Sequence, residues 1–220
     1  MGTLETIEVE TGPSPTASII WMHGLGADGH DFEPIVPEIQ LPIPVRYVFP
    51  HAPRQAVTIN QGMVMRAWYD VTGQRDEDDA GLRRSQRLVE SLIAAERARG
   101  IPARRIVLAG FSQGGAMTLQ TGLRHPERLA GLMALSCYVP IASTVRAEAH
   151  EANRDVPIFM AHGAYDQVIP VERAEIGRDF LAKLGYRVEW HTYPMPHSVC
   201  AEEIADITAW LDSVLPRPAR

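Results

Sequence analysis

The stretch from Arg105 to Met117 restricts the possible folds of this chain more than any other. It begins with a short, wholly apolar run at residues 106–109, which is typical of a strand buried on both faces of a parallel sheet. A Gly-Phe-Ser-Gln-Gly segment (110–114) follows, and good helix formers come after it. Strand, sharp turn and helix is the context in which a G-x-S-x-G pattern indicates a nucleophile elbow. We therefore predict that Ser112 occupies a strained turn at the head of a helix, where small neighbours let strand and helix approach each other.

The rest of the chain repeats this alternation of strand and helix. Further strands are predicted in the leading segment 1–16 and at residues 18–22, 45–49, 132–136, 156–160 and 186–193. Helices are predicted from the acidic run 76–79 to Gly100, after Ser112 as far as His125, over 171–184 and over 203–214, with a short helix inside the polar segment 141–155. This order predicts one α/β domain over residues 1–220, with a mostly parallel central sheet and helices on both faces.

Composition narrows the function classes. The 220 residues are 45% hydrophobic and 22% charged, which suits one globular domain, and the net charge of −6 offers no basic footprint for nucleic acid or an anionic membrane. No run of 18 apolar residues is present, and the N-terminal segment lacks the basic and apolar regions of a secretory signal, so we expect no stable membrane anchor. Two cysteines make no disulfide framework and favour a reducing, cytoplasmic location. The single lysine, Lys183, suggests a GC-rich bacterial source.

Three polar residues that could form a catalytic triad each follow a predicted strand. Ser112 comes after one strand, Asp166 after a later one and His197 after the last, and ligand sites in such sheets lie at the carboxyl ends of strands. Of the eight histidines, only His197 lies beyond both other residues in a loop after a strand. Ser, Asp, His is the chain order of the α/β-hydrolases. We predict that His197 activates the Ser112 hydroxyl and that Asp166 fixes the imidazole tautomer.

Two further sets of residues complete the predicted site. An oxyanion hole needs two N–H donors, and we expect them from Gln113 in the elbow and from Leu25 in the Gly-rich loop 23–30. Residues 53–73 form an irregular but strongly apolar segment, which is either functional or packed down, and we favour a wall or flap of a binding site over plain packing. The residues expected to line a short, partly open acyl groove are Leu25, Met63, Val64, Met65, Trp68, Val168 and Ile169.

The segments at 23–29, 110–115, 162–170 and 196–199, together with 62–70, resemble bacterial carboxylesterases of the phospholipase/carboxylesterase family, which includes acyl-protein thioesterases. The resemblance covers almost the whole chain. It implies an α/β-hydrolase fold without a large cap domain, hydrolysis of esters or thioesters without a cofactor, and often a homodimer. One position departs from the family pattern, since Pro196 stands where glycine usually precedes the histidine. Proline fixes its own φ and restricts Met195, which puts the placement of His197 in question.

Several alternatives stay open. No H-E-x-x-H or paired C-x-x-C pattern occurs, so we expect no metal site. A non-catalytic binding protein of the same fold is the rival from another class, and the presence of all three triad residues argues against it. The residues alone do not separate a hydrolase from a lyase or an acyltransferase. Nor do they choose between a small carboxylic ester of short to medium acyl length, a lysophospholipid and an acylated protein as substrate.

Overall fold

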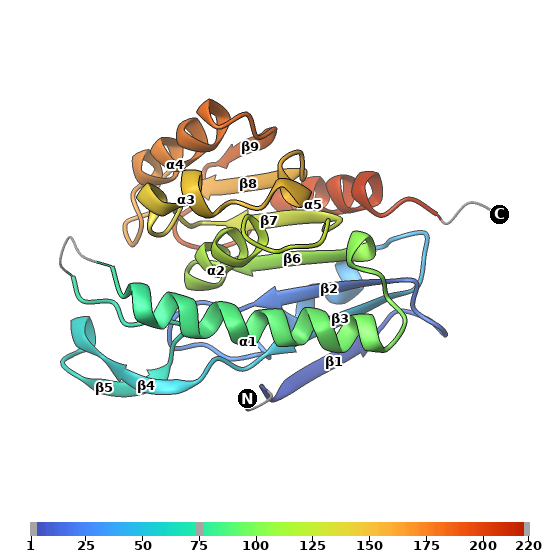
Figure 1. Ribbon diagram of the computed structural model, residues 1–220, viewed down its shortest axis with the longest axis horizontal. Helices are drawn as coiled ribbons and strands as arrows, with labels where there is room; N and C mark the ends of the chain where they lie inside the picture. The colour runs from blue at the N-terminus through green and yellow to red at the C-terminus, as the bar shows by residue number, and fades with distance from the viewer. Residues whose placement is uncertain (1–3, 74–76, 218–220) are drawn as a thin grey trace.

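Residues 4–73 and 77–217, the part of the chain described by the computed structural model, form a central seven-stranded sheet and a separate two-stranded one. The order in the large sheet is β1-β3-β2-β6-β7-β8-β9 (Figure 1). Its edge strand β1 runs antiparallel to β3, and every other neighbouring pair is parallel. The strands are β1 (Thr6–Glu10), β2 (Ala17–Met22), β3 (Val45–Pro50), β6 (Ile106–Phe111), β7 (Gly131–Leu135), β8 (Ile158–Gly163) and β9 (Val188–Tyr193).

Burial along the strands follows their place in the sheet. The inner strands β2, β3, β7 and β8 are buried at every residue, as continuous apolar runs in a parallel sheet require. The two edges, β1 and β9, are instead only partly buried and carry charged side chains on their exposed residues, which discourages pairing with another chain. The prediction of a half-buried edge strand near the C-terminus is thus confirmed.

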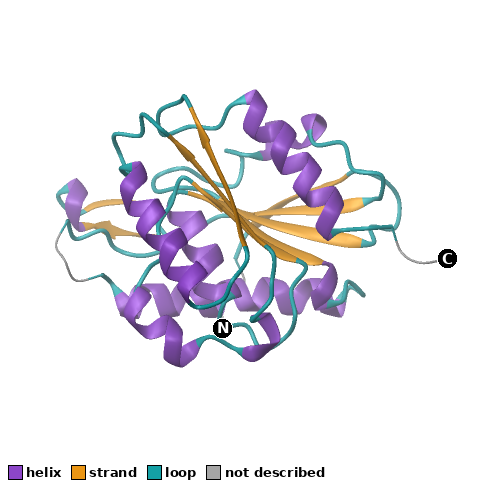
Figure 2. Ribbon diagram, turned by 90° about the horizontal axis from the view of Figure 1, so that it is seen from above, coloured by secondary structure: helices purple, strands orange, loops and turns teal. Residues whose placement is uncertain are grey.

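Helices cover both faces of the sheet (Figure 2). Two apolar clusters form the core, one on each face: helices α1 to α4 contribute to the first, and α5 with the 3-10 helix η1 contributes to the second. The helices are α1 (Asp79–Ala98), α2 (Gln113–Gly122), α3 (Ala142–Glu148), α4 (Val171–Lys183), α5 (Ala201–Val214) and η1 (Glu33–Glu38). This is the α/β-hydrolase architecture that the sequence predicted, and the described residues contain no large cap domain. No helix among them is long and apolar enough to cross a membrane.

The acidic run marks the start of α1, as expected. Asp78 caps this helix by accepting a hydrogen bond of 2.8 Å from the Gly81 N–H, and Asp79 opens the first turn. The predicted run also includes Asp76, which lies outside the described residues. At the other end, Gly100 has φ +95° and stops the helix.

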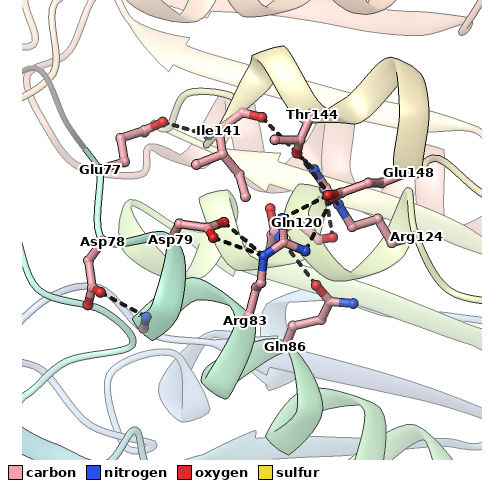
Figure 3. Close-up of polar contacts among 11 residues, drawn as sticks. Glu77, Asp78, Asp79, Arg83, Gln86, Gln120, Arg124, Ile141, Thr144 and Glu148 are labelled. Atoms are coloured by element: carbon pink, nitrogen blue, oxygen red, sulfur yellow. Dashed lines mark hydrogen bonds and ion pairs between the residues drawn. The ribbon is translucent and has the colours of Figure 1, made fainter.

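A polar network ties α1, α2 and α3 together (Figure 3). Glu148 of α3 accepts hydrogen bonds of 2.7 Å from Arg83 of α1 and 2.7 Å from Arg124, which follows α2. A third, of 3.1 Å, comes from the Thr144 hydroxyl. The hydrogen bond from Arg83 is the main cause that lowers the pKa of Glu148 to about 2, against the opposing effect of burial.

The apolar segment 53–73 differs from the prediction of an irregular loop. It contains an antiparallel pair, β4 (Arg54–Val57) and β5 (Met63–Arg66), joined through a 3-10 helix, η2 (Thr58–Asn60). In Figure 1 this hairpin projects below the end of the sheet at which β2 and β6 terminate. Each strand has only four residues, too few for a period-two pattern to stand out in the sequence.

Candidate active site

The first two loops of the site meet because their strands are neighbours. β2 pairs with β6, with Met22 opposite Gly110, and the chain leaves β2 toward β3 on one side and reaches β6 on the other. A reversal of strand order of this kind opens a crevice at the carboxyl ends of the strands, where ligands bind in open α/β sheets. The loop that starts at His23 and the turn at Ser112 both lie there.

Ser112 occupies the strained turn that the sequence predicted. Its backbone angles, φ 56° and ψ −119°, lie in a region that residues other than glycine rarely adopt. The backbone is held by the Ser112 N–H, which donates to the Leu135 carbonyl at 2.9 Å. Glycine is required on both sides of the turn: a Cβ on Gly110 would lie 2.2 Å from the Gly114 carbonyl group, and one on Gly114 would lie 2.1 Å from the Met22 oxygen.

The Gly-rich loop after β2 is fixed by the buried side chain of His23. The Ala52 N–H donates to its Nε2 at 3.0 Å, so Nδ1 carries the hydrogen and donates to the Gly24 carbonyl at 2.7 Å. Burial lowers the pKa of His23 to about 4, which keeps the ring neutral. Gly24 in turn packs against the elbow, where a Cβ would lie 3.3 Å from the Ser112 Cβ.

The two predicted oxyanion donors lie on the two loops that meet at this end of the sheet. Leu25 lies in the loop after β2, and Gln113 is the first residue of α2. Within the described residues neither backbone N–H donates to another protein group. The positive end of the α2 dipole lies at Gln113 and favours a negative charge beside it. Both N–H groups are therefore free to donate to a ligand oxygen.

The Gln113 side chain is hydrogen-bonded to the segment that directly follows the β4–β5 hairpin. Its Oε1 accepts from the Trp68 N–H at 2.9 Å, and its Nε2 donates to the Tyr69 carbonyl at 2.9 Å. The Trp68 indole N–H donates to the His23 carbonyl at 2.9 Å, and the ring is only 1% exposed. The structure thus gives Trp68 a supporting place behind the loop, in contrast to the predicted contact with substrate.

Asp166 lies in the loop after β8 with its carboxylate fully engaged. Oδ1 accepts from the N–H groups of Val168 at 2.8 Å and Ile169 at 2.9 Å, and Oδ2 lies 2.6 Å from His197 Nδ1. Burial raises the pKa of this carboxyl, but the hydrogen bonds from His197, Ile169 and Val168 outweigh it and leave the pKa below its usual value. Asp166 therefore remains ionised at neutral pH.

His197 reaches from β9 back to the elbow. Its ring centroid lies 4.7 Å from that of Phe111, the residue before Ser112, and its side chain is 16% exposed. Because Nδ1 faces the carboxylate, it carries the hydrogen and Nε2 is the basic nitrogen. In the part of the chain that the structure describes, the Ser112 hydroxyl has no hydrogen bond to His197. Pro196 does not prevent the contact with Asp166, although it stands directly before the histidine.

The remaining substrate-binding candidates lie on two different loops. Met65 is half-buried on the hairpin, and its sulfur would lie 3.7 Å from a Cβ on Gly26, beside Leu25. Val168 is 68% exposed in the loop after β8, where Ile169 is buried. Met63 and Val64 are 64% and 55% exposed near the tip of the hairpin.

Two features of the site were not found by sequence reasoning. His162, at the end of β8, lies 3.2 Å from Asp166 Oδ2, and the Gln113 side chain contacts residues about 45 positions away. The spacing of four residues between His162 and Asp166 was the available signal for the first. Within residues 4–73 and 77–217, no group of three or more His, Cys, Asp and Glu side chains is placed to hold a metal ion.

The chain is similar to known hydrolases over nearly its full length. Residues 4–215 match the model of the phospholipase/carboxylesterase family. Acyl-protein thioesterase 1 of Neurospora crassa is 42% identical over 219 residues, which is 93% of this chain and 89% of that protein. Acyl-protein thioesterase 1 of Mycosarcoma maydis is 39% identical over 238 residues, 98% and 99% of the two chains. These relatives are fungal, so they give no support to the bacterial source suggested by the scarcity of lysine.

Solved structures agree with this assignment. The crystal structure of Arabidopsis thaliana SOBER1 superposes with a TM-score of 0.85 at 32% identity, covering 90% of this chain and 99% of that one. The family match, the relatives and the shared architecture lead to one conclusion: this chain belongs to the phospholipase/carboxylesterase family of α/β-hydrolases.

Proposed function

We propose that this protein is a serine hydrolase that cleaves carboxylic esters of short to medium acyl length, and thioesters as well, without a metal or cofactor. One observation carries the proposal: Asp166 and His197 share a hydrogen bond of 2.6 Å, with the His197 ring against Phe111 of the elbow. Because the Asp166 carboxylate is hydrogen-bonded to Nδ1, Nε2 is free to take a proton from Ser112, the residue of the elbow whose side chain is a nucleophile.

The reaction would run in two steps. The Ser112 oxygen attacks the carbonyl carbon while His197 Nε2 takes its proton, and that proton then passes to the departing alcohol or thiol as the acyl-enzyme forms. Water attacks the acyl-enzyme with His197 again acting as base, and the acid leaves as Ser112 recovers its proton. Hydrogen bonds of this kind tighten only when substrate is bound, so we expect the contact between Ser112 and His197 to form in the complex.

The oxyanion would be held by the two free backbone donors. In each tetrahedral intermediate, the N–H groups of Leu25 and Gln113 donate to the former carbonyl oxygen, and the α2 dipole adds to this stabilisation. Removal of one such donor costs about 10²–10³ in kcat in a serine protease. The rigid support of both loops, through His23 and the Gln113 side chain, keeps the donors in place before substrate arrives.

The acyl chain would lie against Leu25, Met65 and Val168, which are at least partly exposed. Burial of each CH₂ group contributes about 0.8 kcal/mol at best. A short, partly open groove buries only the first part of the acyl chain, so the further CH₂ groups of a long chain add no binding energy. Short to medium chains are therefore favoured. The fungal relatives favour a second candidate, an acyl-protein thioesterase, and a lysophospholipase is the third. A comparison of kcat/KM for small esters, lysophospholipids and long-chain S-acylated peptides separates the three.

Three accompanying expectations belong to this proposal. The free cysteines Cys137 and Cys200 favour a reducing, cytoplasmic location. A homodimer is expected from the family resemblance alone, and sedimentation equilibrium would measure it. We expect no nucleic-acid partner, because the chain carries a net charge of −6.

A fluorophosphonate probe tests the central claim. It should label the protein once, at Ser112, since only an activated serine attacks phosphorus quickly. Ser112→Ala should abolish both labelling and ester hydrolysis with unchanged circular dichroism. Ser213→Ala is the matched control, because that hydroxyl donates to the Trp210 carbonyl on α5 and takes no part in the site. Full esterase activity in Ser112→Ala would contradict the proposal.

A further inference from the structure

His162 is a buried histidine that the mechanism above does not use. It is the next-to-last residue of β8 and is 0% exposed. Its Nε2 lies 2.8 Å from the Ile169 carbonyl oxygen and 3.2 Å from Asp166 Oδ2. Asp166 Oδ2 thus has two histidine nitrogens beside it, one from His162 and one from His197.

The neighbours of the ring define its tautomer. The Ile169 carbonyl is an acceptor, so Nε2 carries the hydrogen and donates to it, while Asp166 Oδ2 lies beside the same nitrogen at 3.2 Å. Nδ1 is buried and has no hydrogen-bond partner in the part of the chain that the structure describes. A hydrogen on Nδ1 would be an unsatisfied buried donor, whereas the Nε2–H tautomer leaves only an unsatisfied acceptor and satisfies the Ile169 carbonyl.

The contacts of His162 close a small loop around the catalytic carboxylate. Ile169 donates its N–H to Asp166 Oδ1 at 2.9 Å, and the carbonyl of the same residue accepts from His162. The ring is therefore linked to the Asp166 side chain through the backbone of Ile169, three residues later in the chain. It is itself held by stacking on Trp190 of β9, with ring centroids 6.5 Å apart and an interplanar angle of 24°.

From this geometry we propose that His162 is a positioning residue for the triad, which acts on His197 through Asp166. The proposal rests on the proposed function, because it assigns a role within the same site. By donating to the Ile169 carbonyl, His162 fixes the residue whose N–H donates to Asp166 Oδ1, so that Oδ2 stays directed at His197 Nδ1. The polarised Nε2–H also lies beside Oδ2, at 3.2 Å, and lowers the negative potential that His197 faces.

Loss of this donor should have two measurable effects. A carboxylate free to turn holds His197 less well for proton transfer, so kcat should fall about tenfold, which equals about 1.4 kcal/mol, with KM unchanged. A carboxylate without the His162 N–H dipole beside it also stabilises the imidazolium of His197 more strongly, so the acid limb of the kcat/KM profile should move to higher pH. The titratable groups next to the ring are Asp166 and, through it, His197, and Arg178 of α4 lies over the Trp190 ring.

Two substitutions separate positioning from packing. His162→Leu removes the donor, whereas His162→Gln places an amide N–H near the position of Nε2 and should restore most of kcat and the wild-type acid limb. His125→Leu is the matched control: this histidine is also buried, 6% exposed, with both ring nitrogens unpartnered, and lies beyond the end of α2. We expect His125→Leu to change stability but neither kcat nor the pH profile.

Nitrogen-15 NMR of the ring resonances gives a readout independent of turnover. The wild type should show His162 as the Nε2–H tautomer, and the titration of His197 should move to higher pH in His162→Leu. A wild-type His162 in the Nδ1–H form would overturn the proposal, even where His162→Leu does not fold. So would wild-type kcat with an unmoved acid limb in folded His162→Leu. If Ser112 proved not to be the nucleophile, the function would fail, whereas the NMR titration would still report on the coupling.

Discussion

The substitution Asp166→Asn tests the site most directly, because the structure specifies how the amide must be oriented. Oδ1 accepts two backbone N–H groups, from Val168 and Ile169, so the amide oxygen has to take its place. The amide nitrogen then replaces Oδ2, which lies 2.6 Å from His197 Nδ1 and 3.2 Å from His162 Nε2. An oxygen that accepted a hydrogen bond from His197, and that lay beside the His162 N–H, is thereby exchanged for a donor.

This exchange should reverse the tautomer of His197. The amide donates to Nδ1, so the ring hydrogen moves to Nε2, and Nε2 can no longer take a proton from Ser112. The same chemical change in a serine protease lowers kcat about 10⁴-fold, equivalent to about 5.4 kcal/mol of transition-state stabilisation. We expect a loss of this size here, with KM changed little, since the acyl groove and the oxyanion donors remain.

The assay is steady-state hydrolysis of a small chromogenic ester between about pH 5 and 8, the range in which an imidazole normally titrates. Asp206→Asn is a matched control, because this carboxylate on α5 accepts from the Tyr193 hydroxyl at 2.8 Å and has no contact with His197 among the described residues. It should cost stability and leave kcat near the wild-type value. A fall in kcat of less than tenfold in folded Asp166→Asn would refute the role given to Asp166.

Three further predictions concern stability, specificity and turnover. Glu148→Gln should lower the free energy of unfolding by about 1–2 kcal/mol at pH 7, since a pKa lowered from 4.5 to about 2 sets an upper limit of about 3.4 kcal/mol and the side chain is 31% exposed. This contribution is complete above pH 4.5 and is lost as pH falls toward about 2, so in urea titrations the difference from wild type should shrink below pH 4.5. Met65→Ala should reduce kcat/KM by up to about fourfold per contacting CH₂ for longer acyl chains and spare acetate esters, and an equal loss for all chain lengths would mean that Met65 only supports the fold. Gly163→Ala should lower kcat about 10²-fold, because a Cβ would lie 2.3 Å from the Pro196 oxygen and displace the His197 loop; Gly12→Ala, whose Cβ would meet Pro44 at an ordinary 3.5 Å, is its control.

The sequence predicted the strands where burial was complete and continuous. The apolar run at 106–109 became β6, which extends two residues further to Phe111. The strand predicted at 156–160 lies slightly later in the chain, since β8 starts at Ile158 and continues to Gly163. Pro157 has no N–H to offer to the ladder, and its carbonyl accepts from the Leu132 N–H just before regular pairing begins. The polar end of β8, at His162 and Gly163, gave no hydrophobic signal that would have extended the strand.

The residues that support the site were less accessible to sequence reasoning. The loop positions of Ser112, Asp166 and His197 could be predicted because each follows a strand, and parallel strands bring their carboxyl ends to one edge. The bonds from Gln113 to Trp68 and Tyr69 join residues 45 and 44 positions apart and have no periodic signature. Trp68 illustrates the consequence: an aromatic residue in an apolar segment suggested a substrate contact, and only the fold shows the ring packed behind the loop.

The proline before His197 departs from the family pattern, and the structure shows why the departure is compatible with the site. A proline removes one N–H and fixes one φ, so it is tolerated where that N–H is not needed and where the chain can be supported by its carbonyl groups. Here the Met195 oxygen accepts from the Tyr165 N–H at 3.1 Å, and the Pro196 oxygen accepts from the Ser198 N–H at 2.9 Å. Gly163 completes the arrangement, because the Met195 and Pro196 carbonyls occupy the space that a side chain at that position would need. The glycine at the end of β8 and the carbonyls of the last loop thus set the approach of His197 to Asp166, and the restricted backbone at Pro196 makes that approach more rigid.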